Sequence, residues 1–183
     1  MKFKKGNIPG LIICEPKKIN DERGFFTESF RKDLFENFLG QKINFCQENT
    51  SESKYGVLRG LHFQVEPFAQ SKLVSVLKGK ILDVVIDIRK NSEYYGKNFS
   101  IELDEFSNKQ LFIPKGFAHG FVVISKLARV SYKVDNYYNP EFERGLNFND
   151  SKFGIDWKIN EKEIILNDKD QSYPSFGNDI FFD

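Results

Sequence analysis

The sequence predicts a mainly β protein, a sandwich or small barrel of many short strands that carries a few short helices. Short runs rich in Val, Ile and Phe are separated by frequent turn signals, which is the pattern of such a fold. The turn signals occupy residues 7–10, 20–24, 54–56, 78–79, 90–92, 114–116 and 139–140. The clearest helical pattern, at 32–39, covers only a short stretch of the chain. A barrel of this kind has a mouth and an interior lined by alternate residues, where a small molecule can bind.

The expected elements can be placed in order along the chain. A helix is predicted over 32–39, where four apolar side chains share one side. The clearest strands are predicted at 72–77, 80–88, 97–103, 110–113, 120–125 and 128–134. Residues 81–88 are almost continuously apolar, so this strand is expected to be buried on both faces. From about Asn149 onward the chain lacks a regular pattern and is expected to pack over the β core.

Length and composition indicate an ordinary globular chain. Its 183 residues are 40% hydrophobic and 29% charged, and we expect one domain over 1–183. The net charge of +1 gives no overall attraction to nucleic acid or to an anionic membrane. No apolar run approaches the ~20 residues of a membrane span, and the run at 11–14 is too short for a signal sequence, so we expect a cytoplasmic protein. Cys14 and Cys46 are not in a metal spacing and are expected to be reduced thiols.

The chain has only two histidines, and both lie in glycine-rich segments. A lone histidine near apolar residues is usually a packed core residue, so His62 and His119 need further support before they are given a chemical role. Arg59 precedes His62 by three positions, which places the two on opposite sides of a regular strand. A bulge or turn at Gly60 would bring both side chains to one side.

Several kinds of chemistry fit these residues poorly. A catalytic metal site needs about three protein ligands, yet no His-x-His pair exists and neither histidine has a carboxylate at ligand spacing. There is no Gly-x-Ser-x-Gly elbow and no phosphate-binding glycine loop. We therefore expect no metal and no cofactor. General acid–base catalysis remains, because histidine has a suitable intrinsic pKa.

A catalytic histidine needs a carboxylate behind it. Asp170, Asp83 and Asp87 are the candidates. The two aspartates of the buried strand share one face, and the competing interpretation is a structural acid paired with Arg89 or a backbone donor. The triplet 168–170 taken alone is more typical of a solvated loop.

Tyrosines and basic residues complete the set of candidates. Tyr132, on a predicted strand, is a candidate proton donor, although a strand tyrosine is more often simply packed. Tyr137 or Tyr138 could stack on a nucleobase. Three basic side chains could bind a phosphate or a carboxylate: Arg23, Arg59 and Lys72. The simpler interpretation of each is a charge on the protein surface.

Eight segments carry a resemblance that extends over about residues 5–174. They are 21–26 with Glu28, 47–51, 56–64, 69–74, 83–89, 113–121, 132–140 and 166–170. In their order and spacing they resemble the dTDP-4-dehydrorhamnose 3,5-epimerases, cupin-like enzymes of dTDP-rhamnose synthesis. The resemblance implies a cupin-like jelly roll that works without a cofactor or metal. It also implies a homodimer and a nucleotide-sugar substrate, dTDP-4-dehydro-6-deoxy-D-glucose.

The resemblance also implies roles for individual residues. His62 would be the base and Asp170 its partner, Tyr132 would donate a proton to the opposite face of the sugar, and Lys72 would stabilise negative charge on the C4 oxygen. Tyr138 rather than Tyr137 would stack on the nucleobase. The residues expected to hold the sugar and the diphosphate are Arg23, Glu28, Gln47, Asn49, Arg59, His119, Glu143 and Lys169.

Two positions depart from the family pattern. Phe63 stands where tyrosine is usual, and Ser75 stands where arginine is common. Either change could alter how the substrate is held. The alternatives are therefore an enzyme that acts at C3 only, an epimerase of another nucleotide-linked keto sugar, and a barrel that binds a sugar without catalysis.

Overall fold

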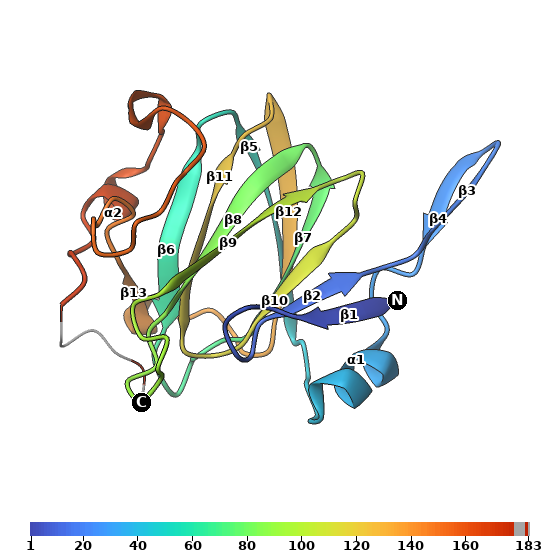
Figure 1. The fold of residues 1–183 in the computed structure, drawn as a ribbon, viewed down its shortest axis with the longest axis horizontal. Helices are drawn as coiled ribbons and strands as arrows, with labels where there is room; N and C mark the ends of the chain where they lie inside the picture. The colour runs from blue at the N-terminus through green and yellow to red at the C-terminus, as the bar shows by residue number, and fades with distance from the viewer. Residues whose placement is uncertain (178–181, 183) are drawn as a thin grey trace.

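Two antiparallel sheets face each other in the computed structural model, which describes residues 1–177 and 182 (Figure 1). The first sheet has the order β1 (Lys2–Lys5), β2 (Ile12–Glu15), β10 (Gln110–Ile113), β7 (Lys72–Lys78), β12 (Leu127–Val134) and β5 (Gln47–Lys54). The second has the order β13 (Glu143–Gly145), β6 (Leu58–Gln64), β11 (Phe117–Val123), β8 (Lys80–Asp87) and β9 (Asn98–Asp104). The remaining elements are the β3 (Lys18–Asp21) and β4 (Gly24–Thr27) hairpin, the helices α1 (Lys32–Leu39) and α2 (Asp168–Gln171), and 3₁₀ turns at Pro140–Phe142 and Glu161–Glu163.

The predicted fold class is confirmed, and most predicted elements lie within one residue of the observed ones. The helix at 32–39 and the strand at 110–113 have the predicted bounds. The strand predicted at 120–125 instead runs from Phe117 to Val123, because its pairing with β8 extends from Phe117 to Val123. β8 is buried on both faces as predicted.

Burial of β8 on both faces has a structural reason. One face of the second sheet packs against the first sheet, through residues such as Val85, Phe121 and Val130. The other face is covered by the segment after β13, which contributes Trp157 and Phe176. This C-terminal segment lies beside β6 (Figure 1), and its helix α2 contacts that strand. The irregular segment expected after residue 149 therefore packs over the β core as predicted.

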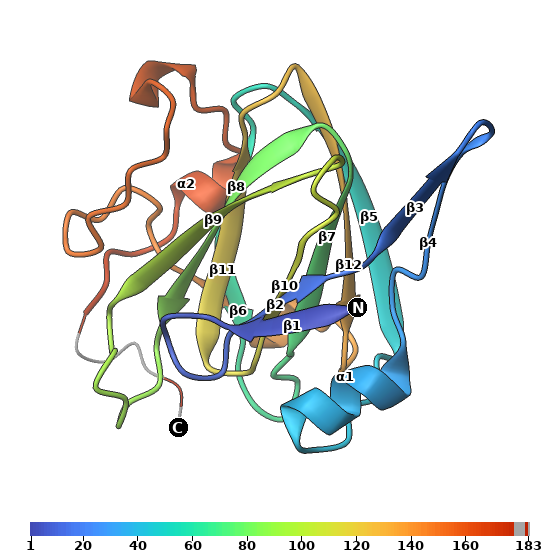
Figure 2. The same ribbon diagram turned by 45° about the vertical axis from the view of Figure 1, so that its right-hand side comes forward.

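The β3–β4 hairpin projects away from the two sheets (Figures 1 and 2). Three of its large apolar side chains are well exposed: Ile19 at 53%, Phe25 at 60% and Phe26 at 68%. The base of the hairpin is fixed, since Lys18 donates to the carbonyl of Glu105. A fixed hairpin with an apolar surface is a typical docking element.

A bulge interrupts β6 at Gly60, as the sequence suggested. His119 of β11 pairs with His62, whereas Phe121 pairs with Arg59, so β6 holds one extra residue between these two pairs. Arg59 and His62 therefore both line the same cavity. Gly60 has φ of 129°, and a Cβ atom there would lie 2.5 Å from the Cα atom of Gly120.

Replacing Gly60 by alanine is expected to lower the free energy of unfolding by about 3 kcal/mol, because the clash is with backbone atoms rather than with a flexible side chain. Gly24 is a matched control, since its φ is 125° and a Cβ atom added there would meet no other atom within 4 Å. Gly24→Ala is expected to cost only about 1 kcal/mol of backbone strain. Urea unfolding of both variants measures the difference, and equal losses would contradict the role of the close contact.

Candidate active site

A cavity of about 320 Å³ lies between the two sheets. Its walls are built by side chains from strands of both sheets and from the C-terminal segment. They are Gln47, Asn49, Ser51, Arg59, His62, Phe63, Gln64, Gln70, Lys72, His119, Phe121, Tyr132, Tyr138, Glu143, Asn167 and Asp170. This volume suits a small organic ligand, and most of the predicted site residues meet here.

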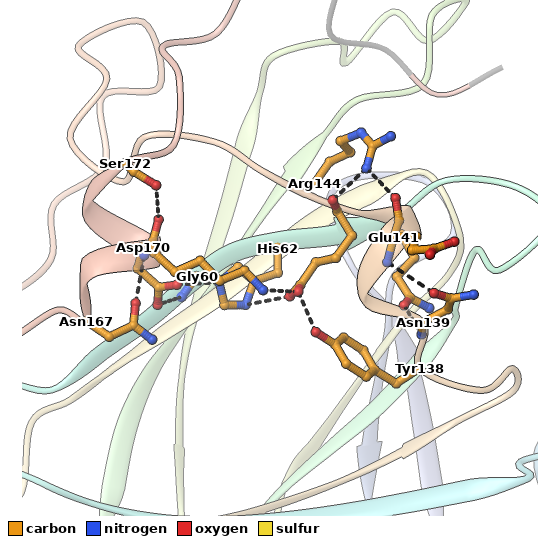
Figure 3. Close-up of polar contacts among 12 residues, drawn as sticks. Gly60, His62, Tyr138, Asn139, Glu141, Arg144, Asn167, Asp170 and Ser172 are labelled. Atoms are coloured by element: carbon orange, nitrogen blue, oxygen red, sulfur yellow. Dashed lines mark hydrogen bonds and ion pairs between the residues drawn. The ribbon is translucent and has the colours of Figure 1, made fainter.

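His62 forms a pair with Asp170 at one side of this cavity (Figure 3). The distance from His62 Nε2 to Asp170 Oδ1 is 2.8 Å. Because a carboxylate only accepts, the neutral imidazole carries its proton on Nε2 and donates it to Asp170. Nδ1 is left with a free lone pair, and its nearest carboxylate oxygen, on Glu143, is 3.9 Å away. His62 is therefore held in the tautomer that a general base requires.

Asp170 is fixed by local structure, although it belongs to a short polar segment. Asn167 caps α2, and its Oδ1 accepts from the backbone N–H of Asp170 at 2.7 Å. The second carboxylate oxygen of Asp170 accepts from the backbone N–H of Gly60 at 3.1 Å. Asp170 is 2% exposed, so the segment is no solvated loop at this position.

The opposite sheet supplies Tyr132 and Lys72. Tyr132 lies on β12 and pairs in register with Asn49 of β5. Burial raises the pKa of Tyr132, against the opposing charge of Arg59, so the phenol keeps its proton at neutral pH. Burial lowers the pKa of Lys72 to about 8, although Glu143 and Asp83 oppose this shift. The Lys72 ammonium makes no hydrogen bond within the described part of the chain and faces the cavity.

A second imidazole–carboxylate pair lies next to the first. His119 pairs across the strands with His62, and its Nε2 lies 2.9 Å from Asp83 Oδ2. Burial lowers the pKa of His119 despite the pull of Asp83 in the other direction. The other oxygen of Asp83 is buried and has no hydrogen-bond partner among residues 1–177 and 182. Asp87, the other candidate on β8, is a structural acid that binds Arg89.

Glu143 joins two other predicted site residues, Lys169 and Tyr138, at the cavity. Its Oε2 accepts from Lys169 and, at 2.7 Å, from the hydroxyl of Tyr138. Burial would raise the pKa of Glu143, but these two hydrogen bonds outweigh it and hold the pKa below its usual value. Lys169 does not line the cavity itself and contacts it through Glu143.

Besides Lys169, two predicted binding residues lie outside this cavity. Arg23 is on the projecting hairpin and pairs with Asp21, and Glu28 is exposed just after the hairpin. The structure of one chain therefore does not bring either residue to the site, because the hairpin extends away from the sheets. Tyr137 is 62% exposed and does not line the cavity, whereas Tyr138 does. Ser75 does not line the cavity either, while Phe63 does.

Some cavity residues were not found from the sequence. They are Ser51, Gln64, Gln70, Phe121 and Asn167. Asn167 carried a usable signal, since asparagine before a short acidic run is a typical helix N-cap. The sequence contained no comparable signal for Ser51, Gln64 or Gln70. Within residues 1–177 and 182, no group of three or more His, Cys, Asp or Glu side chains could hold a metal ion, and no helix is long and apolar enough to cross a membrane.

An antiparallel β-sandwich with a paired imidazole on one sheet, and a phenol and a free ammonium on the other, defines a cupin-like protein equipped for acid–base chemistry on a small molecule. The family model described as dTDP-4-dehydrorhamnose 3,5-epimerase matches residues 5–178. The chain belongs to the dTDP-4-dehydrorhamnose 3,5-epimerase family.

Individual relatives agree with this assignment. The chain is 45% identical to a dTDP-4-dehydrorhamnose 3,5-epimerase from Shigella flexneri, over 97% of both chains. The crystal structure of such an enzyme from Elizabethkingia anophelis NUHP1 superposes with a TM-score of 0.94 at 48% identity, over 99% of both chains. The dTDP-6-deoxy-D-glucose-3,5-epimerase from Legionella pneumophila Philadelphia 1, solved with dTDP-4-keto-L-rhamnose, gives a TM-score of 0.91 at 43% identity, over 95% of this chain and 92% of the other.

Proposed function

We propose that the protein converts dTDP-4-dehydro-6-deoxy-D-glucose into dTDP-4-dehydro-L-rhamnose by inverting C3 and C5. One observation carries the proposal: His62 and Tyr132 enter one cavity from opposite sheets. A base on one face of a sugar and an acid on the other are what inversion of a carbon centre needs. Mere binding of a sugar requires no such opposed pair.

The reaction follows from the ketone at C4 of the substrate. A carbonyl acidifies the hydrogens on its neighbouring carbons, C3 and C5. His62 Nδ1 takes one of these protons, and the C–H electron pair moves into an enolate whose negative charge is on the C4 oxygen. The Tyr132 hydroxyl then returns a proton to the opposite face of the carbon, which inverts it. Asp170 stabilises the imidazolium formed in the first step, and Lys72 stabilises the enolate oxygen.

Other cavity residues are assigned to substrate binding. His119, Gln47, Asn49 and Arg59 line the cavity around the proposed sugar and diphosphate. Tyr138 at the mouth would stack on the nucleobase, with Glu143 and Lys169 beside it.

Incubation in D₂O with dTDP-4-dehydro-6-deoxy-D-glucose tests the reaction directly. We expect deuterium at both C3 and C5, because each inversion exchanges a carbon-bound proton with solvent, and NMR reads the two positions separately. Deuterium at C3 alone would identify an enzyme specific for that carbon. Saturable binding without any exchange would replace the proposal by a sugar-binding barrel. The same experiment with uridine- and guanosine-linked keto sugars tests the choice of nucleotide.

We propose further that the chain works as a homodimer. Arg23 and Glu28 can hold substrate only if the hairpin reaches a cavity other than that of its own chain. The exposed Phe25 and Phe26 give the hairpin an apolar surface that a second copy would cover. We also place the protein in the cytoplasm, and the free thiols of Cys14 and Cys46 support a reducing compartment.

A Phe25→Ser, Phe26→Ser double variant is expected to elute as a monomer and to raise KM at least about tenfold, because the partner's hairpin is lost together with its binding residues. Light scattering gives the mass and steady-state kinetics give KM. Leu77→Ser is a suitable control, since Leu77 is 55% exposed but lies on β7. A monomeric parent chain, or a double variant that remains a dimer, would contradict the proposal.

A further inference from the structure

Gln64 is a buried polar side chain that the reaction does not use. It is the last residue of β6, two positions after His62, and is 5% exposed. Its amide forms three hydrogen bonds to loop backbone: Nε2 donates to the carbonyls of Phe68 at 2.7 Å and Tyr137 at 3.2 Å, and Oε1 accepts from the N–H of Asn139 at 2.7 Å. Two of the three bonds end on the residues on either side of Tyr138.

Tyr138 itself is held from the other sheet. Its backbone N–H donates to Oε1 of Gln47, on β5, at 3.1 Å. β12 ends at Val134 and the next 3₁₀ turn begins at Pro140, so no strand pairing fixes this loop. The N–H groups of 137, 138 and 139 are all satisfied by side chains instead. The loop is thus clamped between a glutamine from each sheet, with the Tyr138 ring at the cavity mouth.

We infer that Gln64 is a positioning residue for nucleobase recognition: it acts through the loop 137–139 to hold the Tyr138 ring where a base can stack on it. This inference rests on the proposed function, which places the nucleotide end of the substrate at Tyr138. A leucine at position 64 has a similar volume but leaves the Tyr137 carbonyl and the Asn139 N–H without partners. The loop is then free to move, and the stacking surface is no longer preorganised.

Calorimetric titration with thymidine 5′-diphosphate measures the effect without any catalytic step. Gln64→Leu is expected to weaken binding about tenfold, which lies within the range that loss of one base–aromatic stack produces. In turnover, KM should rise by a similar factor while kcat stays within about twofold, because His62 and Tyr132 are untouched. A comparable rise in KM is expected for Gln64→Glu, which keeps the acceptor for Asn139 but loses both donors.

A double-mutant cycle with Tyr138→Ala separates positioning from general destabilisation. If Gln64 acts through Tyr138, adding Gln64→Leu to Tyr138→Ala should weaken binding by less than about twofold further. Asn98→Leu is the matched control: Asn98 also donates a side-chain amide to a distant loop carbonyl, that of Phe153, but lies outside the cavity. It should leave binding of thymidine 5′-diphosphate unchanged.

The experiments distinguish failure of the role of Gln64 from failure of the proposed function. Additive losses in the cycle, with a parent chain that binds thymidine 5′-diphosphate normally, would overturn the role of Gln64 alone. So would an equal loss of binding in Asn98→Leu. A parent chain that does not bind thymidine 5′-diphosphate would overturn the proposed function itself.

Discussion

Replacing His62 by alanine is expected to lower the rate of deuterium exchange at C3 and C5 by about 10³-fold, because it removes the proposed base. The only hydrogen bond of the imidazole in the described chain is from Nε2 to Asp170, which leaves Nδ1 able to accept a proton. Exchange in D₂O, followed by NMR, gives the rate. Binding of thymidine 5′-diphosphate should be largely retained, since the base acts on the sugar.

Asp170→Asn provides a second test of the same pair. The amide keeps the shape of the side chain but removes the charge that stabilises the imidazolium, so a loss of about 10²-fold is expected, smaller than that of His62→Ala. Added imidazole should restore part of the exchange in His62→Ala by occupying the vacated space. Full exchange in His62→Ala without any addition would overturn the assignment of the base.

Replacing Lys72 by methionine is expected to lower kcat by about 10²–10³-fold, because the enolate oxygen then forms without a cation beside it. Methionine keeps the length of the side chain and removes only the charge. Steady-state kinetics on the keto sugar measures the loss. Lys80→Met is a suitable control, since Lys80 pairs with Glu102 and does not line the cavity.

The pKa of Lys72 adds a pH dependence to this prediction. The proposed role of Lys72 needs its charged form, and its pKa is about 8, so the rate is expected to fall as the pH rises through this value. Lys72→Arg should remove this fall, since a guanidinium stays protonated, although its geometry lowers the rate at every pH. A wild-type rate that stays level well above pH 8 would contradict the role of the ammonium.

Stability should change in the opposite direction over the same range. The unfolded chain has a lysine pKa near 10.5 and the folded chain one near 8, so between these values the unfolded state binds more protons. The contribution of Lys72 to the free energy of unfolding therefore rises with pH from about 8 to 10.5. Comparison of the wild type with Lys72→Met by urea unfolding isolates this contribution.

The sequence predicted the parts of the fold that depend on local pattern. Strand β8 and helix α1 were placed within one residue because a continuous apolar run and a helical apolar stripe are properties of neighbouring residues. The bulge at Gly60 was suggested because this glycine lies between Arg59 and His62. In a regular strand these two side chains would point to opposite sides. Its register could not be predicted, since it depends on pairing with β11.

Local sequence pattern could not predict which residues assemble into the site. His62 and Asp170 are 108 positions apart, and only the tertiary fold decides that they meet. The resemblance to a family supplied this pairing, which spacing alone left open between three aspartates. Arg23 and Glu28 were predicted to bind substrate, but one chain does not bring them to the cavity. Gln64 was missed because an amide that binds loop backbone has no signature in the sequence.

The order in which the site is built follows from where Asp170 lies. Both sheets are encoded before residue 146, whereas α2, which carries the partner of the base, begins at Asp168. During synthesis the strands of both sheets therefore leave the ribosome before the carboxylate that orients His62. The imidazole is held in one tautomer only once α2 has docked beside β6.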